Sequence, residues 1–161
     1  IAEQLDKIYL ELGGGSNPYE SYTAAWAFGI SQCELDCWKR GKKGIIITMG
    51  DEQLNPYIDK ERYKCVTNQK DVPFDTEELY KEASKKYDIY HINVNHGRMA
   101  PDKSLFYQVI GRDHYSTCEI KAIAQEIAQI IRSHVDSSAI KAPEDSAVEI
   151  ATPTFTENIS W

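Results

Sequence analysis

The stretch Gly44-Ile45-Ile46-Ile47-Thr48-Met49-Gly50-Asp51-Glu52 decides the fold. Its three consecutive isoleucines lack the polar alternation of a half-exposed strand. They predict a short strand buried on both faces, as in a parallel sheet between helices. Gly50 lets the chain turn, and Asp51 and Glu52 follow at the carboxyl end of the strand, where open α/β sheets bind ligands. Because an unpaired carboxylate in a crevice is costly, we expect a divalent cation near Asp51.

Helical and strand patterns alternate along the rest of the chain, which indicates an α/β fold with a mostly parallel sheet and helices on both faces. The strand over residues 88–94 should place His91 in the core. The last helix should point Ile120, Ile123, Ala124, Ile127, Ile130 and Ile131 inward. Apolar spacing predicts helices over residues 1–12, 20–33, 75–86, 104–110 and 118–135, and two further strands over 88–94 and 114–117.

Length and composition indicate one domain, over residues 1–135, followed by a flexible tail over 136–161 that is rich in Ser, Ala, Pro, Glu and Thr. The net charge of -7 argues against a nucleic-acid-binding protein. No apolar run is long enough to cross a bilayer, and no signal peptide is visible, so the four cysteines are expected to be reduced thiols of a cytoplasmic protein. The chain begins at Ile1 inside an expected helix, which suggests a fragment or a processed product.

Three loops are expected at the carboxyl edge of the sheet, over residues 13–19, 50–55 and 95–103. Hard cations such as Mg²⁺ take oxygen ligands from carboxylates, amides and hydroxyls. An alternative interpretation needs no metal: the first loop is a turn with a helix cap, and Asp51 caps a following helix. The candidate metal ligands are Asp51, Asn17 and Ser16, and the further candidate contacts at this edge are Ser21, Glu52 and His96.

Two other chemistries are weaker fits to the sequence. The glycine run over residues 13–15 lacks the Gly-x-x-x-x-Gly-Lys-Ser/Thr pattern of a phosphate loop and follows an expected helix rather than a strand. Cys33 and Cys37 are four residues apart, as in some zinc sites, with His91, His96 or Cys65 as further ligands. No second close cysteine pair exists, so buried free thiols are the favoured interpretation.

Two separated motifs resemble the von Willebrand factor type A domain, in the version found in uncharacterised bacterial proteins. The first is Gly13-Gly14-Gly15-Ser16-Asn17 with Glu20-Ser21-Tyr22 behind it. The second is Lys39-Arg40-Gly41-Lys42-Lys43-Gly44, before the strand that ends at Gly50-Asp51-Glu52. The resemblance covers about residues 1–135.

The resemblance implies a Rossmann-like sheet with a metal-ion-dependent adhesion site, holding Mg²⁺ or Mn²⁺, at its carboxyl edge. Asp51 matches the aspartate that follows the fourth strand in the family, and Asn17 or Ser16 stands where the family has a threonine. The Asp-x-Ser-x-Ser loop of the family is absent, and so are its first three strands. The chain therefore resembles the carboxyl-terminal part of such a domain, and the strand at residues 44–49 is expected to leave an open apolar edge. An upstream part of a longer product, a second chain or the tail would cover that edge.

The function that the resemblance implies is protein–protein recognition without enzymatic activity, in which the ion bridges to an acidic group on the partner. Family members sometimes work beside AAA-type ATPases. Neither a nucleic-acid nor a membrane partner is expected. Two alternatives stay open: a metal-dependent hydrolase that uses Asp51 and Glu52 with His96 as general base, and a metal-free structural interaction module.

Overall fold

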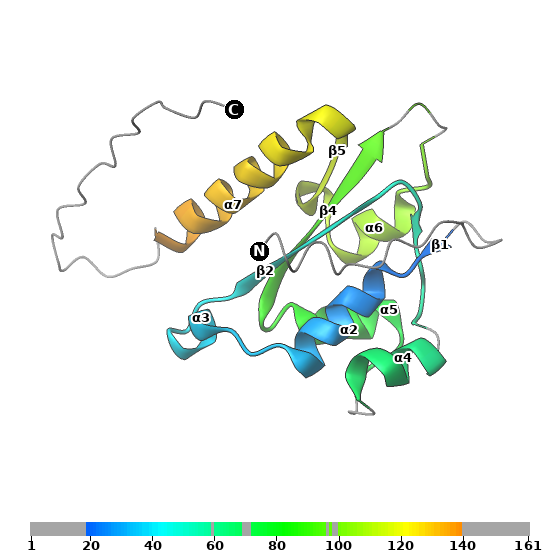
Figure 1. The fold of residues 1–161 in the computed structure, drawn as a ribbon, viewed down its shortest axis with the longest axis vertical. Coiled ribbons are helices and arrows are strands. Elements are labelled where there is room, and N and C mark those ends of the chain that lie inside the picture. Colours follow the sequence, from blue (N-terminus) through cyan, green and yellow to red (C-terminus); the bar gives the residue numbers. More distant parts are fainter. Residues whose placement is uncertain (1–18, 59, 69–71, 96, 98–99, 140–161) are drawn as a thin grey trace, which may run out of the picture.

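A computed structural model describes residues 19–58, 60–68, 72–95, 97 and 100–139 of the chain. Its main sheet has three parallel strands in the order β2-β4-β5, formed by Gly44–Gly50, Tyr87–Asn95 and Tyr115–Glu119. A second, two-residue parallel pair joins β1 (Tyr19–Glu20) to β3 (Gln53–Leu54). The described chain is therefore a mixed α/β structure with parallel strands, as the alternating pattern predicts (Figure 1).

Helices connect the strands and cover the sheet (Figure 1). Short 3-10 helices precede β5 at Arg112–His114 and follow it at Ile120–Ala122. The α-helices are α2 (Tyr22–Gln32), α3 (Asp36–Lys39), α4 (Lys60–Thr67), α5 (Thr76–Ala83), α6 (Ser104–Val109) and α7 (Ile123–Ala139).

The two faces of the sheet meet different helices because side chains of β4 alternate between them. On one face, His91 stacks on Phe106 of α6 and meets the ring of Tyr22 of α2 edge-on. On the other face, Asp88 contacts His134 of α7. The core lies mainly between the sheet and the first set of helices; its largest fully buried apolar side chains are Trp26, Phe106, Leu54, Ile58, Leu79, Ile89 and Ile92.

Strand β2 differs from its expected burial. Gly44 and Thr48 are buried, but Ile45, Ile46 and Ile47 are only half-buried, so the expectation of a strand buried on both faces is wrong. The reason is that, among the described residues, β2 pairs with β4 alone and forms an edge of the sheet. The open apolar edge that the resemblance implies is present in this part of the chain.

The second correction concerns the start and the inward face of the last helix, α7. Cys118 belongs to β5, where it pairs with Val94, and α7 begins only at Ile123. Ile120 and Ile131 are 63% and 45% exposed, and Ala124 is exposed, so the inward orientation expected for these three residues is wrong. Residues 118 and 119, at the start of the predicted helix, pair with β4 as part of β5 instead. The helix therefore begins later, and other residues of it face the sheet.

The third correction concerns α2: its run of apolar residues predicts a largely buried helix, but Ala25 and Phe28 are exposed. The helix expected at residues 1–12 and residues 140–161 of the expected tail lie outside the described residues, whereas residues 136–139 of that tail continue α7. None of the helices in the described part of the chain combines the length and apolar composition that a bilayer-crossing helix needs.

Candidate functional site

The carboxyl ends of the three main strands meet at one edge of the sheet because all three run parallel. Strand β2 ends there at Gly50, and Asp51 and Glu52 follow directly. The short β1–β3 pair brings the start of α2 to the same place, since Tyr19 pairs with Gln53. Ser21, the residue before α2, is thereby carried to the loop that holds the two carboxylates.

Tyr22 and Gly50 make the closest approach at this edge. A Cβ atom added to Gly50 would lie 2.0 Å from the Tyr22 hydroxyl oxygen, so only glycine fits there without a shift. Glu52 donates its backbone N–H to the same oxygen at 3.4 Å. The phenol of Tyr22 therefore holds the first turn of α2 against the end of β2.

Acidic side chains surround this phenol. Burial raises the pKa of Tyr22 to about 12; the hydrogen bond from Glu52 lowers it, and the charges of Glu20, Asp51 and Glu52 raise it further. Three carboxylates thus act on one point at the carboxyl edge. The electrostatic environment there favours a cation.

Asn93 is a second polar group at this edge. It pairs in register with Gly50 and is 3% exposed, and its side-chain oxygen has no hydrogen-bond partner among the described residues. Registered residues of parallel strands point to the same face, so Asn93 lies on the face where Tyr22 packs against Gly50. A buried amide oxygen without a donor is costly, and a ligand at this edge would relieve that cost.

The side chains at this edge carry oxygen donors of the type that hard cations prefer. Within the described residues, no group of three or more His, Cys, Asp and Glu side chains gathers closely enough to hold a metal ion. Mg²⁺, however, is commonly bound by only one or two carboxylates, with water and neutral oxygens completing its shell. Asp51, Glu52 and the amide oxygen of Asn93 supply oxygen donors of this kind.

His91 lies deeper on the same face and is fully buried, as expected for a core histidine. The Thr48 hydroxyl lies 3.2 Å from the Tyr90 carbonyl and 3.0 Å from His91 Nδ1. Because the hydroxyl has one proton to donate and the carbonyl can only accept, Nδ1 carries the histidine proton and donates to Thr48. Burial lowers the pKa of His91 to about 4, so the ring is neutral at pH 7.

The structure brings together three of the residues singled out from the sequence: Asp51, Glu52 and Ser21 lie at one edge. Ser16, Asn17 and His96 lie outside the described residues, so their predicted roles stay predictions. The alternative in which Asp51 caps a following helix is wrong, because strand β3 follows the loop at residues 51–52.

The cysteines are free thiols. Cys33 and Cys37 are half-buried beside the hydroxyl of Tyr87, whose pKa is raised to about 12, chiefly by burial and further by these two cysteines. Cys65 is exposed rather than buried. The described residues therefore give no support to a zinc site at Cys33 and Cys37.

Sequence reasoning missed Tyr22 and Asn93 as site residues. For Asn93 a signal exists, since an amide inside the apolar strand Ile89–Val94 needs a partner at the sheet edge. The contact between Tyr22 and Gly50 joins residues 28 positions apart and depends on how α2 packs.

In comparisons with known proteins, the chain matches no family model, no curated protein and no solved structure.

Proposed function

We propose that this chain is a von Willebrand A-like protein-recognition module with a Rossmann-like sheet. A divalent cation, Mg²⁺ or Mn²⁺, would sit at the carboxyl edge of β2 and bridge to an acidic group on a partner protein. The chain would bind rather than catalyse. By the same resemblance, the partner would include an AAA-type ATPase in the cytoplasm.

The observation that carries the proposal is the buried, unpartnered amide oxygen of Asn93 at the end of the sheet where Asp51 follows β2. A neutral oxygen and a carboxylate are two of the ligand types that hard cations take. The three carboxylates that raise the Tyr22 pKa add negative charge at the same place.

Asp51 would bind the cation directly or through water, and Asn93 would contribute its amide oxygen. Ser21 and Glu52 lie at the same edge, and Asn17 or Ser16 would assist, as the resemblance implies. When bound, the cation would supply a positive charge that attracts a carboxylate of the partner. The residues of this chain would hold that charge at the sheet edge and leave coordination positions open.

Calorimetric titration with Mn²⁺ and Mg²⁺ tests the site. We expect saturable binding by the chain, and in Asp51→Ala a Kd at least 10-fold higher, because a charged ligand is lost. Asp36→Ala is the matched control: it also removes one carboxylate, from an exposed position in α3, and should leave the Kd unchanged. Equal affinity in Asp51→Ala and the parent chain would overturn the assignment of Asp51.

Asn93→Leu examines the second oxygen. Leucine has the same number and branching of side-chain heavy atoms and no amide, so the variant should fold with a stability close to that of the parent when EDTA is present. The same variant should bind Mn²⁺ more weakly. Unchanged Mn²⁺ affinity would remove Asn93 from the site.

Two results would favour the alternatives. If the parent chain binds neither ion, a metal-free interaction module is the better description. Turnover of a generic phosphoester or peptide substrate that disappears in Asp51→Asn would instead identify a metal-dependent hydrolase.

A further inference from the structure

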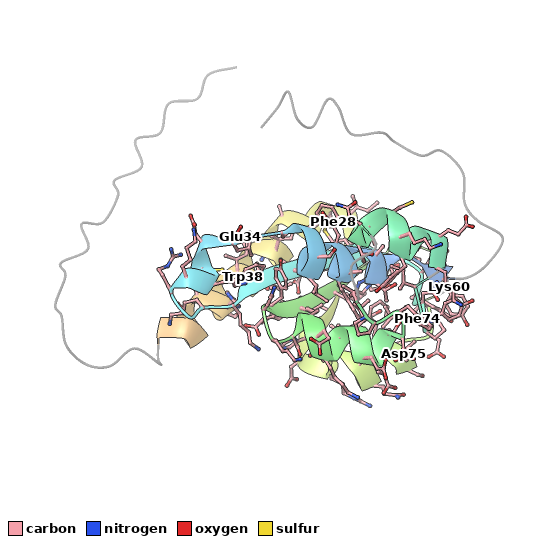
Figure 2. The ribbon with its side chains drawn as sticks, turned by 90° about the horizontal axis from the view of Figure 1, so that it is seen from below. Phe28, Glu34, Trp38, Lys60, Phe74 and Asp75 are labelled. Atoms are coloured by element: carbon pink, nitrogen blue, oxygen red, sulfur yellow. The ribbon has the colours of Figure 1, made fainter. Side chains whose placement is uncertain are left out.

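A groove of about 840 Å³ lies on the helical side of the molecule, away from the residues of the proposed cation site. Helices α4 and α5 form its two walls, and both pack on α2. Ile30 of α2 and the segment 72–74 form its floor. In Figure 2, Lys60, Phe74 and Asp75 of this groove lie together at one end of the molecule, far from Trp38.

The two walls carry opposite charges. Lys60 and Lys64 line the groove on α4, and Glu78 and Glu82 line it on α5. The members of each pair are four residues apart, so each wall repeats its charge about every 6 Å along its helix. Lys85 pairs with Glu82 at 2.5 Å, which leaves Glu78 as the less neutralised acid of the two.

The floor is apolar and includes an exposed aromatic ring. Phe74 is 52% exposed although it is a large hydrophobic side chain. Val72 is buried and forms the floor with Ile30 and Pro73. Phe74 therefore adds an exposed apolar ring between the two charged rows.

Hydrogen bonds hold the groove in shape. Val72 donates its backbone N–H to the hydroxyl of Tyr63 on α4. Ile58 donates its N–H to the Phe74 carbonyl at 2.8 Å. Asp75 caps α5 by accepting from the N–H groups of Glu77 and Glu78 at 3.0 and 3.1 Å. A groove fixed in this way loses little conformational entropy when a ligand binds.

We infer that this groove docks an amphipathic α-helix of a partner protein, with acidic residues along one flank of its apolar face and basic residues along the other. The groove presents three surfaces, and a helix can offer an apolar face and two flanks, whereas an extended strand offers only two faces. Its volume is about that of two turns of a helix about 10 Å wide. The acidic flank would face Lys60 and Lys64, and the basic flank would face Glu78 and Glu82.

A stapled two-turn probe peptide tests this pairing by fluorescence anisotropy, with EDTA present so that the cation site plays no part. The probe has leucines on one face, glutamates on one flank and lysines on the other; a reference peptide has glutamine on both flanks. We expect the charged probe to bind at least 10-fold tighter than the reference at low salt. Equal affinity of the charged probe and the glutamine reference would overturn the inference.

Charge reversal on one wall sharpens the test. In Lys60→Glu/Lys64→Glu both walls are acidic, so the charged probe should lose at least 10-fold in affinity. A third peptide with lysines on both flanks should bind this variant at least 10-fold tighter than it binds the parent. The matched control Lys39→Glu/Lys121→Glu changes two exposed lysines outside the groove by the same charge and should leave every affinity unchanged.

Phe74→Ala removes the exposed ring and should weaken all three peptides, including the uncharged reference. Because Phe74 is half-exposed, circular dichroism should show the variant folded. The inference fails if the charge-reversed protein still prefers the charged probe. Asp51→Ala should bind the probe like the parent, so the outcome is independent of the proposed cation site.

Discussion

Tyr22 sets how closely α2 approaches the end of β2, because its hydroxyl occupies the space beside Gly50. The same phenol accepts the N–H of Glu52, so one side chain fixes both the helix start and the acidic loop. A side chain at position 50 would push these two elements apart. The geometry of the candidate site therefore depends on a single missing methyl group.

We predict that Gly50→Ala lowers the free energy of unfolding by about 2 kcal/mol, as overpacking does elsewhere. In a Tyr22→Phe background the cost should fall by at least about 0.5 kcal/mol, because the added Cβ then meets ring carbons at 2.8 and 2.9 Å instead of an oxygen at 2.0 Å. Urea unfolding of the parent, both single variants and the double variant gives this coupling. Strictly additive effects would show that the two positions do not touch.

At the scale of secondary-structure elements, α5 is the helix whose start the sequence determines most directly. Asp75 is followed by Glu77 and Glu78, a pattern typical of a capped helix with acidic residues in its first turn. The structure confirms the cap, since Asp75 accepts two backbone N–H groups. Local chemistry was enough here because cap and capped groups are neighbours in the chain.

Removing this cap should destabilise the protein. We expect Asp75→Ala to lower the free energy of unfolding by about 1 kcal/mol, since two N–H groups lose their acceptor. Asp36→Ala is a suitable comparison, because Asp36 lies in the first turn of α3 and pairs at the surface with Lys39. Chemical denaturation that finds equal losses for the two variants would contradict the capping role.

The boundary between β5 and α7, in contrast, could not be predicted from neighbouring residues. The apolar pattern predicts a helix from Cys118, but β5 extends through Glu119 by pairing with β4. Residues 118 and 119 gain backbone hydrogen bonds from a strand more than 20 residues earlier, and no local pattern records that gain. The exposed Ile120 is the consequence at the junction.

At the scale of the whole molecule, buried His91 links stability to pH. A pKa lowered from 6.5 to about 4 means that the unfolded chain takes up a proton below pH 6.5 while the folded chain stays neutral. The contribution of neutral, buried His91 to the free energy of unfolding is therefore fully present above about pH 6.5. It is lost as the pH falls to about 4. The loss amounts to about 3 kcal/mol.

His91→Leu should remove this pH dependence. Carboxylates titrate in both proteins, so their contributions cancel when the two are compared. Between pH 7 and pH 4, the free energy of unfolding should fall by about 3 kcal/mol less in His91→Leu than in the parent chain. The measurement is urea unfolding at several pH values; parallel curves for the two proteins would rule out His91 as the acid-sensitive group.

The sequence by itself determined the α/β class, the parallel strand at residues 44–50, the cap of α5 and the acidic turn at Asp51. These features depend on spacing within one element or on neighbouring residues, which the chain order records. It also placed His91 in the core, because alternation within a strand assigns faces.

Only the tertiary structure decided the half-burial of Ile45–Ile47, the extent of β5, the contact of Tyr22 with Gly50 and the groove between α4 and α5. Each of these arises between segments distant in the chain, and its geometry follows from how helices pack on the sheet. Periodicity shows which residues are apolar. Whether a neighbouring strand or helix covers them is settled by the free energy of the whole assembly, in which long-range pairing outweighs local preference.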